Sequence, residues 1–320
     1  MKIAFYNPFK DPQGFRDSLR ECPDVEFVVA DTENDLPRAL SGAEIVIVAN
    51  RTYTEVPAAH IRNHGTALRW IAFMTSGFDK AEANGLPAGV TVTNMAGLRA
   101  FAVAEHAFFL MLSLFRASRA TEAAQLGNEW ARIPLTPLMN NAASKHLVIV
   151  GTGAIAQDFA RKAKAFDMRV TGISRRTGTL EHFDAMRPRE QLAAAAAEAD
   201  VLLVAALAAE DTFGIISREV IRAMGPHSYL VNIARGSLVD EAALIEALQE
   251  RQIAGAGLDV QEQEPTPADH PLWSLDNVII TPHVAGAGGD VPGLSHEGLF
   301  MENFRRWRAG EPLDKVVART

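Results

Sequence analysis

Short apolar runs alternate with longer polar or amphipathic segments along the first third of the chain. The runs lie at residues 2–7, 25–30, 43–50, 68–74 and 90–94. The segments between them are long enough for crossover helices, so the strands should be parallel and covered by helices on both faces. This pattern predicts one α/β layer domain.

A second series of apolar runs begins at residue 146. Its six predicted strands lie at residues 146–150, 168–174, 199–207, 228–234, 254–260 and 277–282. Helical segments separate these strands; in one of them Asp240 is placed to cap a helix whose apolar stripe includes Leu244 and Leu248. Six strands in β-α-β order predict a doubly wound parallel sheet of the dinucleotide-binding type.

A long apolar segment separates the two series. Residues 98–126 are predicted to form one helix that is apolar around most of its circumference. Glu105, His106 and Arg116 interrupt the apolar run, which argues against a membrane span. We therefore expect this helix to be buried at a domain junction or against a second subunit.

The end of the chain is expected to complete the first domain. No strand is predicted after Pro282, but residues 294–310 form an amphipathic segment that must pack against another element. The expected partner is the first domain, because the far side of the second sheet is hard to reach from here. The predicted domains are residues 1–98 with 287–320, and residues 99–286.

Composition and charge fit two domains and exclude some classes of function. The 320 residues are 48% hydrophobic and 22% charged, as in ordinary globular proteins. A net charge of -8 without a Lys/Arg run argues against nucleic-acid binding. No apolar run reaches the length of a membrane span, and the charged first dozen residues do not resemble a signal peptide. Cys22 is the one cysteine, so no disulfide or metal site is expected and a cytoplasmic location is favoured.

The turn after residue 150 predicts a phosphate-binding loop. Gly151 ends an apolar strand, and Gly153 and the small Ala156 follow in the pattern G-x-G-x-x-A. A turn of this kind directs the first N–H groups and the dipole of a helix at a pyrophosphate. The alternative is that the glycines only turn the chain.

The residues about 20 positions after the glycine turn indicate which dinucleotide binds. A fold that binds NAD usually has an acidic residue there, which accepts hydrogen bonds from the ribose 2′-OH. This chain has Ser174, Arg175 and Arg176 instead, and Asp167 precedes the strand. Basic residues suit the 2′-phosphate of NADP, so NADP is the predicted cofactor and NAD the second choice. The alternative is a solvated pair of loop arginines.

Three further residues with catalytic chemistry follow later strands of the same sheet. Arg235, Glu264 and His283 all come at carboxyl ends of predicted strands, where ligands collect in open α/β folds. An arginine can polarise a ketone and bind a carboxylate, and a histidine can deliver a proton. Glu264 would raise the pKa of His283 if it paired with one ring nitrogen. Taken alone, a histidine after a strand is more often structural, and Arg-Gly after a strand often only makes a turn.

Several long motifs occur in order along most of the chain. They are SGFD (76–79), NMAG (94–97), VAEHA (103–107), GTGAIA (151–156), NIARGSLVDEAAL (232–244), AGAGLDVQEQEP (254–265), HPLW (270–273) and NVIITPHVAGAG (277–288). In these motifs the chain resembles the D-isomer-specific 2-hydroxyacid dehydrogenases. The resemblance implies a Rossmann dinucleotide-binding domain and a discontinuous, flavodoxin-like substrate domain.

The resemblance also implies roles for individual residues. It assigns catalysis to Arg235, Glu264 and His283, and substrate-carboxylate binding to backbone N–H groups near Ser76 and Gly77. It assigns cofactor contacts to Ala154, Ile155, the loop 174–176, Ala234, Asp259 and Gly286. Similar enzymes are usually homodimers joined through the dinucleotide domain by the helix that here starts near Val103, with Trp130 reaching the neighbouring site. One departure is the run Ala206 to Ala209, where relatives commonly have Leu-Pro-Leu-Thr and thus a hydroxyl.

The expected activity is hydride transfer between NADPH and a small 2-oxo acid, which gives the D-2-hydroxy acid. Glyoxylate and hydroxypyruvate are the expected substrates. A formate- or phosphite-type dehydrogenase of the same superfamily is one alternative, although the formate type usually has Gln in place of Glu264. A dinucleotide-sensing protein similar to the C-terminal-binding-protein corepressors is another, since such proteins can keep the catalytic residues.

Overall fold

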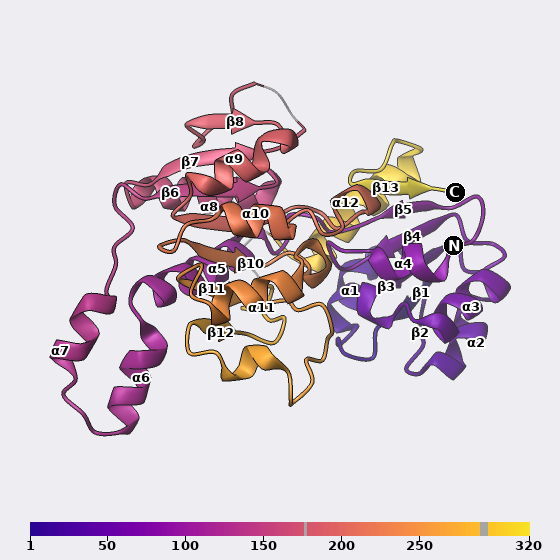
Figure 1. Ribbon diagram of the computed structural model, residues 1–320. Coiled ribbons are helices and arrows are strands. Elements are labelled where there is room, and N and C mark those ends of the chain that lie inside the picture. Colours follow the sequence, from indigo (N-terminus) through magenta and orange to yellow (C-terminus); the bar gives the residue numbers. More distant parts are fainter. Residues whose placement is uncertain (176–177, 289–293) are drawn as a thin grey trace. The chain divides into compact units, whose positions relative to one another are not determined.

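A computed structural model describes residues 1–175, 178–288 and 294–320 (Figure 1). The chain divides into two compact units, Met1–Arg99 with Gly289–Thr320, and Ala100–Gly288. Each unit is built around a sheet with helices on its faces, which confirms the predicted two-domain α/β class.

The first unit contains a six-stranded sheet with the order β13-β5-β4-β3-β1-β2. Its strands are β1 (Lys2–Tyr6), β2 (Glu26–Val29), β3 (Ile45–Val48), β4 (Trp70–Phe73), β5 (Thr91–Thr93) and β13 (Val316–Arg319). Its helices are α1 (Gln13–Leu19), α2 (Leu36–Leu40), α3 (Glu55–His64), α4 (Asp79–Asn84) and α12 (His296–Ala309). The neighbours from β5 to β2 pair in parallel, as the crossover segments predicted.

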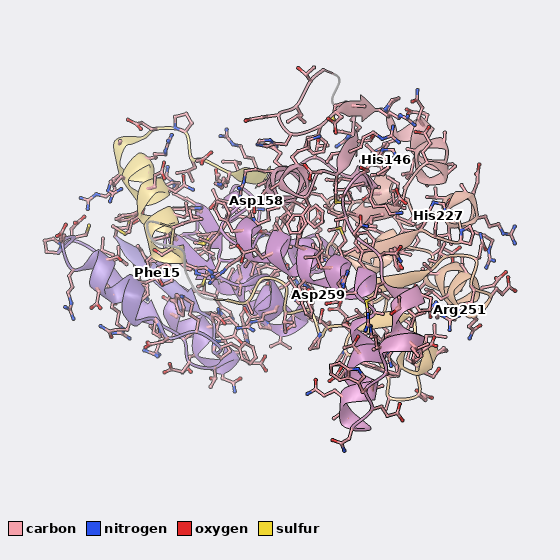
Figure 2. The ribbon with its side chains drawn as sticks, turned by 90° about the vertical axis from the view of Figure 1, so that its left-hand side faces the viewer. Phe15, His146, Asp158, His227, Arg251 and Asp259 are labelled. Atoms are coloured by element: carbon pink, nitrogen blue, oxygen red, sulfur yellow. The ribbon has the colours of Figure 1, made fainter. Side chains whose placement is uncertain are left out.

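Helix α12 brings the end of the chain onto this sheet. The Phe300 ring stacks on the fully buried Trp70 of β4 with centroids 5.2 Å apart, and the Trp70 indole N–H donates a hydrogen bond to Thr93. Phe15 of α1, labelled in Figure 2, meets Phe300 edge-on with ring centroids 5.7 Å apart. The aromatic stripe of the amphipathic segment is thus buried in this unit.

Strand β13 contradicts the expectation that no strand follows Pro282. It pairs antiparallel with β5, and the Thr320 hydroxyl beyond it accepts a hydrogen bond from Val90 N–H and donates one to Pro87. Its four residues are half-exposed or exposed at a sheet edge, and its apolar run, residues 316–318, is too short to predict a strand.

The second unit contains a seven-stranded, wholly parallel sheet with the order β12-β11-β10-β9-β6-β7-β8. Its strands are β6 (His146–Val150), β7 (Arg169–Ile173), β8 (Ala185–Arg187), β9 (Val201–Val204), β10 (Tyr229–Asn232), β11 (Gly255–Leu258) and β12 (Val278–Ile280). Its helices are α5 (Ala100–Phe115), α6 (Ser118–Leu126), α7 (Arg132–Leu135), α8 (Ala154–Ala165), α9 (Leu192–Ala197), α10 (Arg218–Ala223) and α11 (Glu241–Gln249).

Both faces of this second sheet are buried. Along β9, Leu202 and Val204 belong to the core beneath α9, α10 and α11, while Val201 and Leu203 belong to the core shared with α5 and α8. This alternation is the period of two that a doubly covered strand requires. The strand order reverses at β6, which lies between β7 and β9, and such a switch point is where open α/β sheets bind ligands.

Two details of this unit differ from the prediction. Strand β8 adds a seventh strand, whose three half-exposed or exposed residues lack an apolar run. The single helix expected over 98–126 is two helices, α5 and α6, because Ala117 takes a left-handed conformation with φ of 47°. Among the described residues no single helix is long and apolar enough to cross a membrane; α5 and α6 reach the required length only together, across a bend of 68°.

Candidate functional site

The glycine turn lies between β6 and α8, at the switch point of the second sheet. Gly151 has φ of +94°, and a Cβ built on it would lie 2.7 Å from the backbone of Ala205 and Ala206. Both observations require glycine at this position. The close approach brings the segment after β9 directly over the turn.

The next glycine borders open space at the start of α8. Apart from chain neighbours, no atom of the described residues lies within 4 Å of a Cβ built on Gly153. Gly153 is also the N-cap residue, and no described side chain caps the helix. The first N–H groups of a helix have no intrahelical acceptor, and pyrophosphate binding at the first turn of α8, which includes Ala154 and Ile155, stays a prediction.

The end of β7 lies beside this turn. The Thr152 hydroxyl donates a hydrogen bond to the Ser174 hydroxyl at 3.1 Å, which ties the turn to β7. Arg175 follows with 76% of its side chain exposed, and its guanidinium lies 3.3 Å from the Asp211 carboxylate. Arg176, the other predicted contact, lies outside the described residues.

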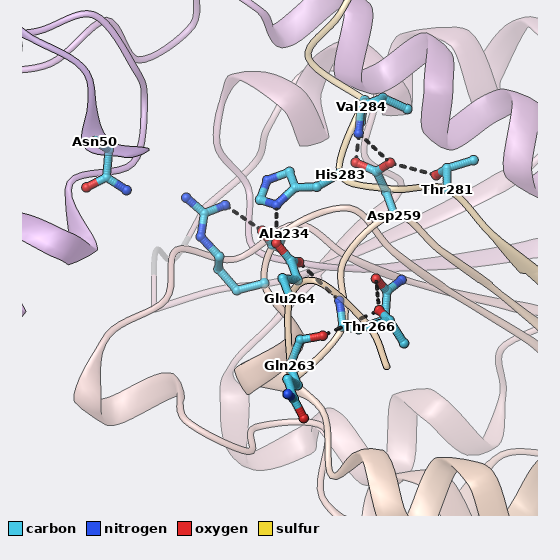
Figure 3. Close-up of polar contacts among 12 residues, drawn as sticks. Asn50, Ala234, Asp259, Gln263, Glu264, Thr266, Thr281, His283 and Val284 are labelled. Atoms are coloured by element: carbon cyan, nitrogen blue, oxygen red, sulfur yellow. Dashed lines mark hydrogen bonds and ion pairs between the residues drawn. The ribbon is translucent and has the colours of Figure 1, made fainter. Parts of the chain in front are cut away.

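The pair formed by His283 and Glu264 stands at the carboxyl edge of the same sheet. Glu264 follows β11 and His283 follows β12, and the His283 Nδ1 is 2.7 Å from Glu264 Oε2 (Figure 3). A second hydrogen bond, from Gln261 N–H at 3.2 Å, holds the other oxygen of Glu264. The structure therefore contains the pairing that the sequence predicted.

Each member of this pair stabilises the charged form of the other. The hydrogen bond to Glu264 raises the pKa of His283 above its ordinary value, and burial opposes this only in part. Burial alone would raise the pKa of Glu264, but the hydrogen bond from His283 and its charge lower it instead. Together these shifts favour an imidazolium paired with a carboxylate near neutral pH.

Arg235 lies in the turn after β10, close enough to act electrostatically on both members of the pair. Its charge lowers the pKa of His283 and that of Glu264. The turn is held by Asn232, whose amide donates to the Arg235 carbonyl at 2.9 Å and accepts from Ala234 N–H at 3.0 Å. The structure thus brings the three predicted catalytic residues together.

Asp259 is the structural centre of the turn that carries His283. Its carboxylate is 1% exposed and accepts hydrogen bonds from the Thr281 hydroxyl at 2.6 Å and from Val284 and Ala285 N–H at 2.9 Å each. The backbone at His283 has φ of 53°, in the left-handed region. Gly286 continues the same turn beyond Ala285, and a cofactor contact by Asp259 or Gly286 stays a prediction.

Two further contacts at this edge were not predicted from the sequence. His106 of α5 reaches Thr281 with its Nε2 at 2.8 Å, which links the VAEHA segment to the turn around Asp259. The Thr212 hydroxyl donates a hydrogen bond to the Leu207 carbonyl and accepts one from the Ala209 N–H. These hydrogen bonds fasten the segment that follows β9.

Ser76 and Gly77 belong to the first unit, in the loop between β4 and α4. The Ser76 carbonyl accepts a hydrogen bond from the Asn94 amide, and the Gly77 carbonyl accepts one from the Thr75 hydroxyl at 2.9 Å. The loop is therefore fixed by its own unit. Substrate binding by its backbone N–H groups stays a prediction.

Comparisons with known proteins agree with this arrangement. The NAD binding domain model of the D-isomer specific 2-hydroxyacid dehydrogenases matches residues 108–285, and the catalytic domain model of the same family matches residues 3–162. The glyoxylate reductase of Pyrococcus furiosus is 34% identical over 296 residues, which cover 90% of this chain and 88% of that protein.

Solved structures resemble the whole chain. A D-isomer specific 2-hydroxyacid dehydrogenase family protein from Aeromonas salmonicida has a TM-score of 0.87 at 27% identity, covering 99% of this chain and 98% of that one. The NADPH-dependent glyoxylate/hydroxypyruvate reductase SmGhrB from Sinorhizobium meliloti, in complex with citrate, has a TM-score of 0.80 at 27% identity, covering 99% and 97%.

Proposed function

We propose a reaction for this chain from one premise: it belongs to the D-isomer specific 2-hydroxyacid dehydrogenase family. The resemblance seen in the sequence motifs is thereby confirmed. The chain is an oxidoreductase with an NAD binding domain, and its substrate is a small hydroxy or oxo acid.

Within this family we assign the chain to the reductases of glyoxylate, hydroxypyruvate or a close relative. Hydroxypyruvate would give the D-2-hydroxy acid, and glyoxylate would give glycolate, which is achiral. Support comes from a glyoxylate reductase among the relatives and a glyoxylate/hydroxypyruvate reductase among the similar structures. The observation that carries the proposal is the 2.7 Å hydrogen bond between His283 and Glu264.

In this proposal His283 is the proton donor. Its Nδ1–H is held by Glu264, so in the imidazolium form the Nε2–H is left to face the substrate. As the ketone oxygen gains negative charge, His283 transfers this proton to it and becomes neutral. Glu264 fixes the orientation of the ring and raises the fraction of His283 that is protonated at working pH.

Arg235 and the loop of Ser76 and Gly77 would bind the substrate. A guanidinium polarises a ketone oxygen and can also pair with a carboxylate, as proposed here for Arg235. Backbone N–H groups at Ser76 and Gly77 would hold the substrate carboxylate.

When bound, the nicotinamide cofactor supplies the hydride. Its pyrophosphate would rest on the N–H groups at Gly151, Gly153, Ala154 and Ile155. Its nicotinamide end would contact Ala234, Asp259 and Gly286. We propose a preference for NADP over NAD, because Ser174, Arg175 and Arg176 stand where an enzyme specific for NAD has an acidic residue.

We further propose a cytoplasmic homodimer joined through the second unit. Helices α6 and α7 extend from the sheet of that unit (Figure 1) and bury no residue. They and the loop between them expose Leu126, Trp130 and Ile133, with Trp130 94% exposed. Such a concentration of exposed apolar side chains is typical of an interface. The single cysteine, Cys22, suits the reducing cytoplasm.

The test is a reduction assay on the purified protein. NADPH or NADH is offered with glyoxylate, hydroxypyruvate and pyruvate, and the loss of absorbance at 340 nm is followed. We expect turnover with at least one of the first two acids, a higher kcat/KM with NADPH, and a D-configured product from hydroxypyruvate. Cofactor binding without turnover of any oxo acid would refute the reductase assignment.

A further inference from the structure

Arg175 shares an acidic partner with a second arginine. The Asp211 Oδ2 lies 3.3 Å from Arg175 and 2.7 Å from Arg189. The Arg189 guanidinium also donates to the Asp211 carbonyl at 3.3 Å. The three residues come from three separate segments, after β7, after β8 and after β9, so the sheet assembles them at its carboxyl edge.

The Asp211 carboxylate is held in place by its own turn and by Arg189. It lies in a single turn of 3-10 helix, Glu210–Thr212, which the buried Thr212 hydroxyl fastens to Leu207 and Ala209. Arg189, with 25% of its side chain exposed, binds both the side chain and the backbone of Asp211. Arg175 is 76% exposed and has a single contact to the pair, so it is the member that can turn toward a ligand.

Asp211 is an anion at any assay pH near neutral. The hydrogen bond from Arg189 lowers the pKa of its carboxyl, and the charge of Arg175 adds to this effect. A phosphate that approaches Arg175 therefore meets a carboxylate already bound to the same guanidinium. Two anions that compete for one exposed cation weaken each other's binding.

We propose that Asp211 competes with the 2′-phosphate of NADP for Arg175 and thereby sets the ratio of NADPH to NADH affinity, with Arg189 as the residue that positions Asp211. This inference rests on the proposed placement of the 2′-phosphate at Arg175. Asp211 makes the preference for NADPH over NADH smaller than Arg175 alone would give. NADPH must compete with Asp211 for Arg175, whereas NADH leaves the Arg175–Asp211 contact intact.

The test compares Asp211→Asn with the wild-type protein by isothermal titration at pH 8, where a phosphate monoester is a dianion. The probes are NADPH, NADH, 2′,5′-ADP and 5′-AMP. We expect Asp211→Asn to tighten NADPH and 2′,5′-ADP by about threefold to tenfold, and to change NADH and 5′-AMP less than about twofold. Unchanged or weaker binding of both phosphate-bearing ligands would overturn the proposal.

A matched control removes the same charge elsewhere in the unit. Glu246 pairs with Arg218 on the surface, with 45% and 40% of their side chains exposed. Glu246→Gln should leave the affinities for all four ligands unchanged. If it raises the NADPH affinity as much as Asp211→Asn does, the effect of Asp211→Asn comes from net charge alone. If Asp211→Asn unfolds at a lower temperature than the wild type, Asp211→Ala and Asp211→Ser must reproduce the gain for the proposal to stand.

Two more variants separate the inference from its premise. Arg175→Ala should weaken NADPH and leave NADH nearly unchanged; if it weakens neither, the placement of the phosphate fails whatever Asp211→Asn does. If Arg175→Ala behaves as expected and Asp211→Asn has no effect, only the present inference fails. Arg189→Gln should have no further effect on NADPH affinity in the Asp211→Asn background, and a further loss there would make Arg189 a phosphate ligand instead.

Discussion

Asp259 accepts hydrogen bonds from the N–H groups of Val284 and Ala285, and so holds His283 in a left-handed backbone conformation. A positive φ is uncommon for residues other than glycine, so contacts from the surrounding chain help to maintain it. The buried carboxylate provides those contacts. Asp259 directly follows β11, whereas His283 follows the neighbouring strand β12. The orientation of the proposed proton donor thus depends on a residue that precedes it by 24 positions in the sequence.

Asp259→Asn should therefore impair both stability and turnover. The amide can replace one carboxylate oxygen, but its NH2 group then meets a backbone N–H that is left without an acceptor. The cost of one unsatisfied buried group is about 1–3 kcal/mol in the free energy of unfolding. Urea denaturation measures this loss, and kcat should fall as the turn loosens. Asp269→Asn, an exposed change in the same segment, is the control; equal stability of the two variants would contradict the role of Asp259.

The pH dependence of reduction should report the His283–Glu264 pair. Reduction needs protonated His283, so kcat/KM should decline as the pH rises through the raised pKa of His283. Glu264→Gln removes the carboxylate that raises this pKa, and the declining limb should move to lower pH. Glu262→Gln removes a charge from the same loop and should leave the limb in place. A profile of Glu264→Gln that coincides with the wild type would exclude the pair from the proton transfer.

The same pair makes a pH-dependent contribution to stability. The raised pKa of His283 stabilises the fold at low pH, and that contribution is lost as the pH rises through this pKa. The lowered pKa of Glu264 acts in the opposite sense, and its contribution is lost as the pH falls through it. The difference in unfolding free energy between the wild type and Glu264→Gln should therefore be largest between the two pKa values.

The two glycines of the turn should respond differently to alanine. Gly151→Ala places a Cβ against the backbone of Ala205 and Ala206 at a positive φ, and should cost about 1–3 kcal/mol of stability. In Gly153→Ala the new methyl group meets no described atom within 4 Å, so the thermal midpoint should not change. The NADPH affinity should fall, because the methyl group enters the space proposed for the pyrophosphate. Thermal denaturation and NADPH titration of both variants decide the point. Equal NADPH affinity of Gly153→Ala and the wild type would place the pyrophosphate elsewhere.

The proposed dimer can be tested at the exposed side chains of α7. Ile133 is 86% exposed, so Ile133→Asp should not disturb the fold of one chain. It should nevertheless convert a dimer to a monomer at micromolar concentration, as measured by light scattering after size-exclusion chromatography. Val56→Asp changes an exposed apolar residue of α3 in the first unit and should leave the dimer intact. A dimeric Ile133→Asp variant would place the interface elsewhere.

The part of the site that the sequence predicted follows from the parallel order of the sheet. Glu264 and His283 follow the neighbouring strands β11 and β12, so the ends of those strands bring them to one edge. The turn at Gly151 was recognisable for a similar reason, since a strand, a glycine turn and a helix follow directly in the chain.

The remainder depends on contacts that no local pattern contains. Strands β8 and β13 are short and incompletely buried, so pairing with a neighbouring strand defines them rather than an apolar run. The break at Ala117 has no glycine or proline to mark it. The contacts of Asp211 with Arg175 and Arg189 join residues 36 and 22 positions apart, respectively. The sequence alone offered no signal for this cluster.

The sheet of the first unit takes its strand β13 and its helix α12 from the far end of the chain. During synthesis, Ala100–Gly288 is a continuous segment that can fold before the ribosome has made the last residues. The first unit cannot, because Trp70 lacks its stacking partner Phe300 and β5 lacks its edge neighbour until then. Residues 1–99 therefore precede Ala100–Gly288 in the chain but complete their core only after it.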